Sequence, residues 1–86
     1  MIIVKNNIIY VPKNYNVTGT LQLVVKDRAT DEAIVFDNPS DNAFPGSSYH
    51  ILTIDTGRLE PSTEYEYTLI AKDVEKIIGR GLLRTE

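Results

Sequence analysis

The sequence predicts a small all-β domain, an antiparallel β-sandwich of about seven short strands. Apolar and polar residues alternate along several segments, most regularly in Leu59–Ala71, and no window keeps an i, i+3, i+4, i+7 apolar stripe for three helical turns. Turn-forming residues recur along the chain at the spacing typical of short strands. Parallel pairing would require crossover helices, for which the chain has no room. Its 86 residues predict one domain, residues 1–86.

The strands follow from the apolar runs and their alternation. Between the first two, Lys5-Asn6-Asn7 predicts a hairpin or a sharp kink, because asparagine tolerates positive φ. Residues 12–19 predict a polar loop, and Asn38–Ser47, with prolines and a glycine, predicts a long one. The expected strands, in order, are Ile2–Val4, Ile8–Val11, Leu21–Val25, Ala33–Asp37, Ser48–Ile54, Glu64–Lys72 and Lys76–Arg84.

Composition excludes several classes of function. The absence of cysteine excludes disulfides, a thiolate nucleophile and cysteine metal sites. The formal net charge is −3, without the basic stripe that nucleic-acid binding needs. The apolar runs are too short to span a membrane, and no basic start with a long apolar stretch marks a signal peptide. We therefore expect a protein of the cytoplasm that binds neither nucleic acid nor membrane.

One motif carries a family resemblance. Leu-x-Pro-x-Thr-x-Tyr, residues 59–65, resembles the tyrosine corner of immunoglobulin-like sandwiches, in its fibronectin type III version. The resemblance implies that Leu59 ends one strand, Pro61 stops pairing, and the Tyr65 hydroxyl reaches back to backbone near Leu59. It covers about 13 residues, and the tryptophan usual in fibronectin modules is absent. The alternative is a proline turn before an ordinary alternating strand.

A second, looser resemblance covers residues 65–86. The run Tyr-x-Tyr-x-Leu, a turn and Gly-Leu-Leu-Arg is similar to the closing hairpin of small Ig-like structural proteins of tailed bacteriophages, capsid auxiliary proteins among them. This resemblance implies a virion component, assembled in the host cytoplasm in many copies, with other virion or assembly proteins as partners. Any final hairpin with a glycine bulge shares the pattern.

No residue set predicts a reaction. His50 is the single histidine, and on an alternating strand it shares a face with Leu52 and Ile54, which favours a structural role over catalysis. The segment DNPSDN, residues 37–42, could suggest calcium, but Asp and Asn are also ordinary turn residues. The carboxylates of Glu60, Glu64 and Glu66 fit a solvated face, and residues 79–81 fit a glycine bulge. We expect no catalytic residue, metal, cofactor or small-molecule substrate.

Apolar residues are in surplus at both ends of the chain. Consecutive apolar residues in a strand face opposite ways, so both faces of the first and last strands are apolar. In Ig-like folds these strands commonly lie side by side, which would gather the surplus at one edge and invite a partner. In the alternative, residues 1–11 fold over the open end of the sandwich within the monomer. The residues predicted to contact a partner are Ile2, Ile3, Ile9, Ile78, Leu82 and Leu83.

These observations lead to two functional hypotheses. The first is a non-enzymatic structural or interaction protein, a capsid auxiliary, decoration or tail-attached protein of a tailed bacteriophage. The second is a fibronectin type III-like binding module that recognises a protein or a glycan through loops such as Asn38–Ser47.

Overall fold

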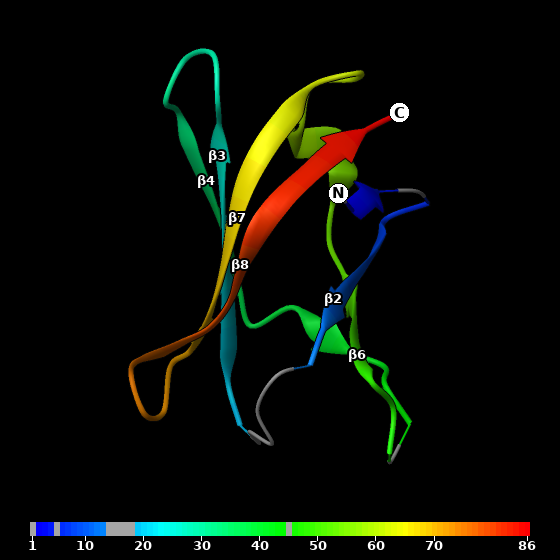
Figure 1. Ribbon diagram of the computed structural model, residues 1–86, viewed down its shortest axis with the longest axis vertical. Coiled ribbons are helices and arrows are strands. Elements are labelled where there is room, and N and C mark those ends of the chain that lie inside the picture. Colours follow the sequence, from blue (N-terminus) through cyan, green and yellow to red (C-terminus); the bar gives the residue numbers. More distant parts are fainter. Residues whose placement is uncertain (1, 5, 14–18, 45) are drawn as a thin grey trace.

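The protein folds as two β-sheets packed face to face (Figure 1). The computed structural model describes residues 2–4, 6–13, 19–44 and 46–86. Met1 and most of the loop predicted for residues 12–19 lie outside the described residues. The described chain is nearly all strand and turn, as predicted, and none of its helical segments is long and apolar enough to cross a membrane.

The larger sheet has five strands in the order β1-β8-β7-β3-β4. Its centre is the run β3, β7 and β8, in which each strand pairs antiparallel with the next along most of its length. The strand bounds are β1 Ile2–Val4, β3 Leu21–Asp27, β4 Ala33–Asp37, β7 Glu64–Ala71 and β8 Lys76–Thr85.

The smaller sheet has three strands in the order β2-β6-β5, all paired antiparallel. It consists of β2 (Ile8–Pro12), β6 (Tyr49–Thr53) and the very short β5 (Ser40–Asp41). A 3₁₀ turn at Thr56–Arg58 leads from β6 towards the larger sheet, and the Asp55 carboxylate accepts a hydrogen bond from the Gly57 N–H at 2.9 Å. The short β5 lies within the segment predicted as a loop, so the described residues form eight strands where about seven were expected.

One strand pair is parallel, which corrects the expectation that every pair is antiparallel. β1 lies beside the end of β8, with Ile2 opposite Leu83 and Val4 opposite Thr85. Parallel neighbours need a long connection, and here the connection is the rest of the domain, including the whole of the smaller sheet. No crossover helix is therefore required. The first and last strands do lie side by side, as expected.

The segment between β1 and β2 is a kink and not a hairpin, because the two strands belong to different sheets. Asn6 and Asn7 both have positive φ, 55° and 62°, a conformation that asparagine adopts more readily than most residues. The Asn7 carbonyl accepts a hydrogen bond from the Ile54 N–H at 2.9 Å. This contact fixes the point where the chain passes from one sheet to the other.

The core lies between the sheets and is built from alternate residues of each strand, as the period-two pattern predicts. Gly81 of β8 contributes by having no side chain, because a Cβ there would lie 2.8 Å from Cε2 of Tyr67. The buried apolar residues are Val4, Ile9, Val11, Leu21, Leu23, Val25, Phe36, Leu52, Ile54, Leu59, Tyr65, Tyr67, Leu69, Ala71, Ile78 and Leu83.

Candidate functional site

The segment before β7 is held by the Tyr65 side chain. The Tyr65 hydroxyl accepts a hydrogen bond from the backbone N–H of Glu60 at 2.8 Å, one residue beyond the buried Leu59. Pro61 and Ser62 form the turn between them, and Ser62 has a φ of 50°. Tyr65 is itself almost fully buried. Its ring and hydroxyl therefore fix the path by which the chain enters the larger sheet.

Thr85, which sequence reasoning missed, joins the same turn to the end of β8. Its hydroxyl donates to the carbonyl of Glu60 at 2.5 Å and accepts from the N–H of Thr63 at 2.9 Å. The backbone N–H of Thr85 also donates to the Thr63 carbonyl at 3.0 Å. A terminal threonine carries no sequence signal for this role, because its partners lie more than 20 residues away. The arrangement around Tyr65 is structural and presents no reactive group.

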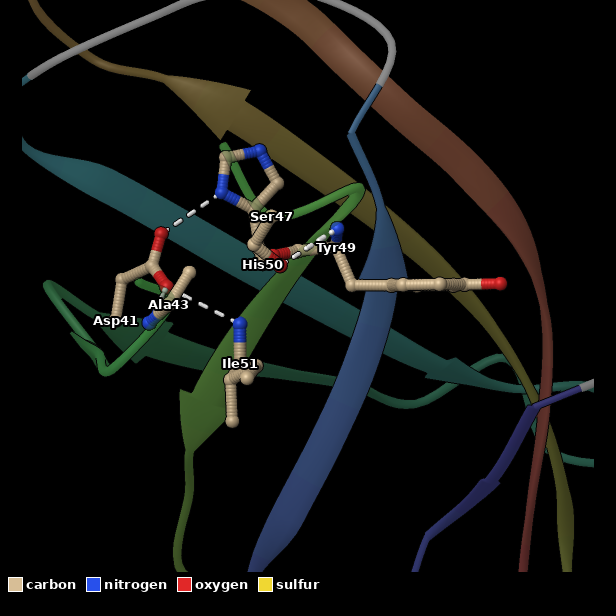
Figure 2. Close-up of polar contacts among 6 residues, drawn as sticks. All are labelled: Asp41, Ala43, Ser47, Tyr49, His50 and Ile51. Atoms are coloured by element: carbon tan, nitrogen blue, oxygen red, sulfur yellow. Dashed lines mark hydrogen bonds and ion pairs between the residues drawn. The ribbon is translucent and has the colours of Figure 1, made fainter. Parts of the chain in front are cut away.

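His50 and Asp41 form the most chemically distinctive contact of the described chain (Figure 2). Nδ1 of the buried His50 lies 2.8 Å from Oδ2 of Asp41. Because a carboxylate only accepts hydrogen bonds, Nδ1 carries the proton and donates it. The other carboxylate oxygen accepts from the N–H groups of Ala43 at 3.0 Å and Ile51 at 3.1 Å.

This environment changes the acidity of Asp41. Partial burial acts to raise the pKa of its carboxyl, but the hydrogen bonds from His50, Ala43 and Ile51, together with the charge that the ring carries when protonated, lower the pKa below its ordinary value. The carboxylate therefore stays ionised and keeps accepting these bonds. The sequence predicted that His50 shares a strand face with Leu52 and Ile54, and the structure buries all three.

An Asp–His pair also forms part of a hydrolytic triad, which needs a nucleophile on the second ring nitrogen. The nearest serine in Figure 2, Ser47, is engaged elsewhere: its hydroxyl donates to the Tyr49 carbonyl at 2.8 Å and accepts from the Tyr49 N–H at 3.1 Å. No hydroxyl of a described residue hydrogen-bonds to His50. Within the part of the chain that the structure describes, the pair ties β5 to β6 and has no hydroxyl on the second ring nitrogen.

The acidic residues weighed as ligands are dispersed. The Asp37 carboxylate accepts a hydrogen bond from the Gln22 amide of β3 at 2.7 Å, whereas the Asp41 carboxylate binds His50 of β6. The two carboxylates of residues 37–42 therefore bind side chains of different strands. Glu64 forms an ion pair with Arg28 at 2.7 Å. Among the described residues, no three acidic or histidine side chains gather closely enough to hold a metal ion.

The structure separates the six residues predicted to contact a partner. Ile9, Ile78 and Leu83 are buried in the core of the monomer, so their side chains are not exposed on its surface. Each sits at an inward position of its strand, and the face that an apolar pair turns inward cannot be read from sequence, since a shift of one residue exchanges the faces. Ile2 is half-buried and packs against the core. Ile3, 50% exposed, and the half-buried Leu82 remain at the surface.

Another group of exposed and half-buried apolar residues lies away from Ile3 and Leu82, on the outer face of the three-stranded sheet. Register places Tyr10 opposite Ile51 and Pro12 opposite Tyr49 on neighbouring strands. Tyr10 is 52% exposed and Tyr49 is 47% exposed, and Figure 2 shows Tyr49 directed away from the His50 ring. We call this set the tyrosine face: Ile8, Tyr10, Pro12, Tyr49 and Ile51.

The tyrosine face carries no charge. The only ionisable groups on β2, β5 and β6 other than the tyrosines are His50, which is buried, and Asp41, which binds it. The outer face of the five-stranded sheet is different, because Glu66 there lies between Lys26 and Leu82 and Arg84 lies opposite Glu64. Sequence reasoning counted residues 1–11 in the apolar surplus but did not place Tyr10 on one face with Tyr49, because that face is formed by pairing between two strands that are distant along the chain. Comparison of the chain with protein-family models, with curated proteins and with solved structures found no match.

Proposed function

We propose that the protein is a non-enzymatic interaction protein that binds a protein partner through the tyrosine face. The observation that carries the proposal is a sheet face with two half-exposed tyrosines and no charged side chain. The cores of protein interfaces are depleted of charge and enriched in tyrosine. Exposed aromatic residues on a rigid sheet also bring little conformational entropy cost to binding.

The size of the face suits a protein present in many copies. Five-residue strands β2 and β6, with the short β5 beside them, give a footprint on the order of 200 Å² at about 3.3 Å per residue and about 4.8 Å between strands. A stable interface buries about 800 Å² on each partner. A single contact of this size is weak. Many copies bound to a repeating surface gain strength from avidity.

A virion component meets that requirement. The resemblance of residues 65–86 to small Ig-like structural proteins of tailed bacteriophages supports a capsid auxiliary, decoration or tail-attached protein, whose partners are other virion proteins. The Tyr65 contact with the Glu60 backbone supports the Ig-like assignment, because that contact defines a tyrosine corner. This proposal requires no catalytic residue, cofactor, nucleic acid or small-molecule substrate.

A second candidate is a fibronectin type III-like module that recognises a protein or a glycan through the Asn38–Ser47 segment. Its support is Phe44, which is 64% exposed on that segment. The loop is anchored at one side by the Asp41–His50 contact and at the other by the Ser47 hydrogen bonds to Tyr49. An aromatic side chain on an anchored loop can serve as a binding contact.

Mass spectrometry of particles purified from producing cells tests the first proposal. We expect the protein in the particles at a copy number in proportion to a repeating structural unit. Tyr10→Lys and Tyr49→Lys should fold and be lost from the particles, whereas Gln22→Lys, on the outer face of β3, should be retained. Absence of the wild-type protein from the particles would overturn the virion assignment. Retention of both tyrosine variants would overturn the tyrosine face as the contact surface, and binding lost only on Phe44→Ser would favour the second candidate.

A further inference from the structure

β8 has a long stretch with a strand on only one side. β7 pairs with β8 from Lys76 to Arg84, but β1 covers the opposite side only at Leu83, Arg84 and Thr85. Within the described chain, no strand pairs with that side of β8 between Ile77 and Leu82. Backbone N–H and C=O groups on an open strand edge are a template for pairing with another strand.

Other edges of the two sheets are better protected. The β4 edge is covered by Arg58, whose guanidinium donates to the Val35 carbonyl at 3.1 Å and stacks 4.7 Å above the centre of the Phe36 ring. β5 has two residues, and β2 ends in Pro12, which has no N–H to donate. β8 has no proline.

A bulge limits the usable length of the open edge. The pairing of β7 with β8 shifts between Leu69 and Ile70, which leaves Ile78 as the extra residue. Bulges twist an edge and interrupt pairing. Gly79–Leu82 lie beyond the bulge in regular register with β7, and they offer room for a partner segment of about four or five residues, roughly 13–16 Å long.

The side chains of this edge point to the chemistry of its partner. Arg80 and Leu82 lie on the outer face of β8, opposite Thr68 and Glu66, and together with Tyr67 and Gly81 these residues line a groove of about 390 Å³. Arg80 is exposed and makes no hydrogen bond or ion pair with a described residue. A strand added beside β8 would bring a side chain next to Arg80 and another next to Leu82, two positions apart.

A second copy of the chain does not fit this edge. β8 contains Lys76, Arg80 and Arg84 and no acidic residue. Two β8 edges paired with each other would bring basic side chains of the two copies together, and like charges on adjacent strands are destabilising.

We infer that the open edge of β8 binds an extended segment of a partner protein by strand addition, with an acidic residue beside Arg80 and an apolar residue, two positions away, beside Leu82. The backbone hydrogen bonds supply affinity and the two side-chain contacts supply selectivity. This inference rests on the proposed role as an interaction protein, but it concerns a surface separate from the tyrosine face.

Titration with a defined peptide, followed by NMR, tests the inference without the natural partner. The probe is Ile-Thr-Glu-Thr-Ile with blocked ends, which matches the length of the open edge and whose symmetry places an isoleucine beside Leu82 in either strand direction. We expect chemical-shift changes centred on residues 79–82 and slower amide exchange at the open side of β8. The same peptide with lysine in place of glutamate should bind about fivefold more weakly, as loss of an exposed ion pair and gain of repulsion imply.

Variants and a modified peptide separate the two parts of the inference. Arg80→Glu should reverse the preference and favour the lysine peptide. Arg84→Gln, on the same strand and face but beside β1, should leave binding within twofold of wild type. Two further peptides carry N-methyl groups on alternate residues, so that each blocks the N–H groups along one edge of the peptide strand. We expect one of these two peptides to lose binding and the other to keep it. Shifts away from β8, indifference to the Arg80 reversal, or equal binding of both N-methylated peptides would each overturn the inference. Failure here leaves the particle experiment on Tyr10 and Tyr49 unaffected, so the two proposals can fail separately.

Discussion

Oδ2 of Asp41 lies 2.8 Å from Nδ1 of the buried His50, so the two-residue strand β5 is tied to β6 by side chains as well as by backbone. Two paired residues give β5 few ladder hydrogen bonds of its own. The carboxylate also accepts from two backbone N–H groups, those of Ala43 and Ile51. Asp41 therefore organises the β5–β6 connection, and replacing it should weaken several contacts of this connection at once.

Asp41→Ala should lower the free energy of unfolding by about 1–3 kcal/mol, because it leaves the buried His50 N–H without an acceptor. Asp41→Asn, which keeps one carbonyl oxygen, should cost less than Asp41→Ala. Urea denaturation measures both. The control is Asp37→Ala, which removes a solvent-exposed hydrogen bond between the Gln22 and Asp37 side chains and should cost well under 1 kcal/mol. Equal effects at the two positions would show that the His50 contact contributes nothing.

The lowered pKa of Asp41 predicts a pH dependence of stability. A carboxyl whose pKa is lower in the folded protein than in the unfolded chain stabilises the fold above the unfolded value, about 4, and loses that contribution as pH falls through the folded pKa. The difference in unfolding free energy between wild type and Asp41→Asn should therefore be largest near pH 6 and shrink below pH 4. Urea titrations across that range measure it. A difference that grows as the solution becomes more acidic would contradict the assignment.

Tyr65→Phe should cost about 1 kcal/mol, the usual net value of one hydrogen bond, and leave the fold intact. Tyr65→Ala should cost about 3–5 kcal/mol, as truncation of a buried aromatic does. Tyr67→Phe is the matched control, because the Tyr67 hydroxyl makes no hydrogen bond with a described residue although the ring is buried. Chemical denaturation compares the three. If Tyr65→Phe left the free energy of unfolding unchanged while Tyr67→Phe lowered it, the structural role assigned to the Tyr65 hydroxyl would be wrong.

Lysine substitutions at paired apolar positions should separate core from surface. Leu83→Lys should unfold the domain, because an unpaired charge in the core is severely destabilising. Ile3→Lys, at a half-exposed position, should yield a folded protein with stability within about 1 kcal/mol of wild type. Circular dichroism and thermal melting distinguish the outcomes. A folded Leu83→Lys variant, or an unfolded Ile3→Lys variant, would contradict the assignment of Leu83 to the core and of Ile3 to the surface.

The sequence was sufficient where neighbouring residues decide the structure. The alternation in β7 and the Leu59–Tyr65 spacing are local patterns, and both predicted which residues the structure buries. It was insufficient where residues distant along the chain decide. Asp41 looked like a turn residue because its partner is nine positions away, on another strand. Ile2 and Ile3 were indistinguishable because only pairing with β8 determines which of them faces the core.

The pairing of β1 with β8 also bears on biosynthesis. β1 leaves the ribosome before β8, and its partner residues Leu83–Thr85 follow about 80 positions later. At bacterial and eukaryotic elongation rates this interval lasts roughly 4–16 s. During it, Ile2 and Val4 have no strand to join, and the strand between β1 and β7 does not yet exist. The larger sheet can close only once Thr85 has been translated, and until then the apolar residues Ile2 and Val4 must be kept from aggregating.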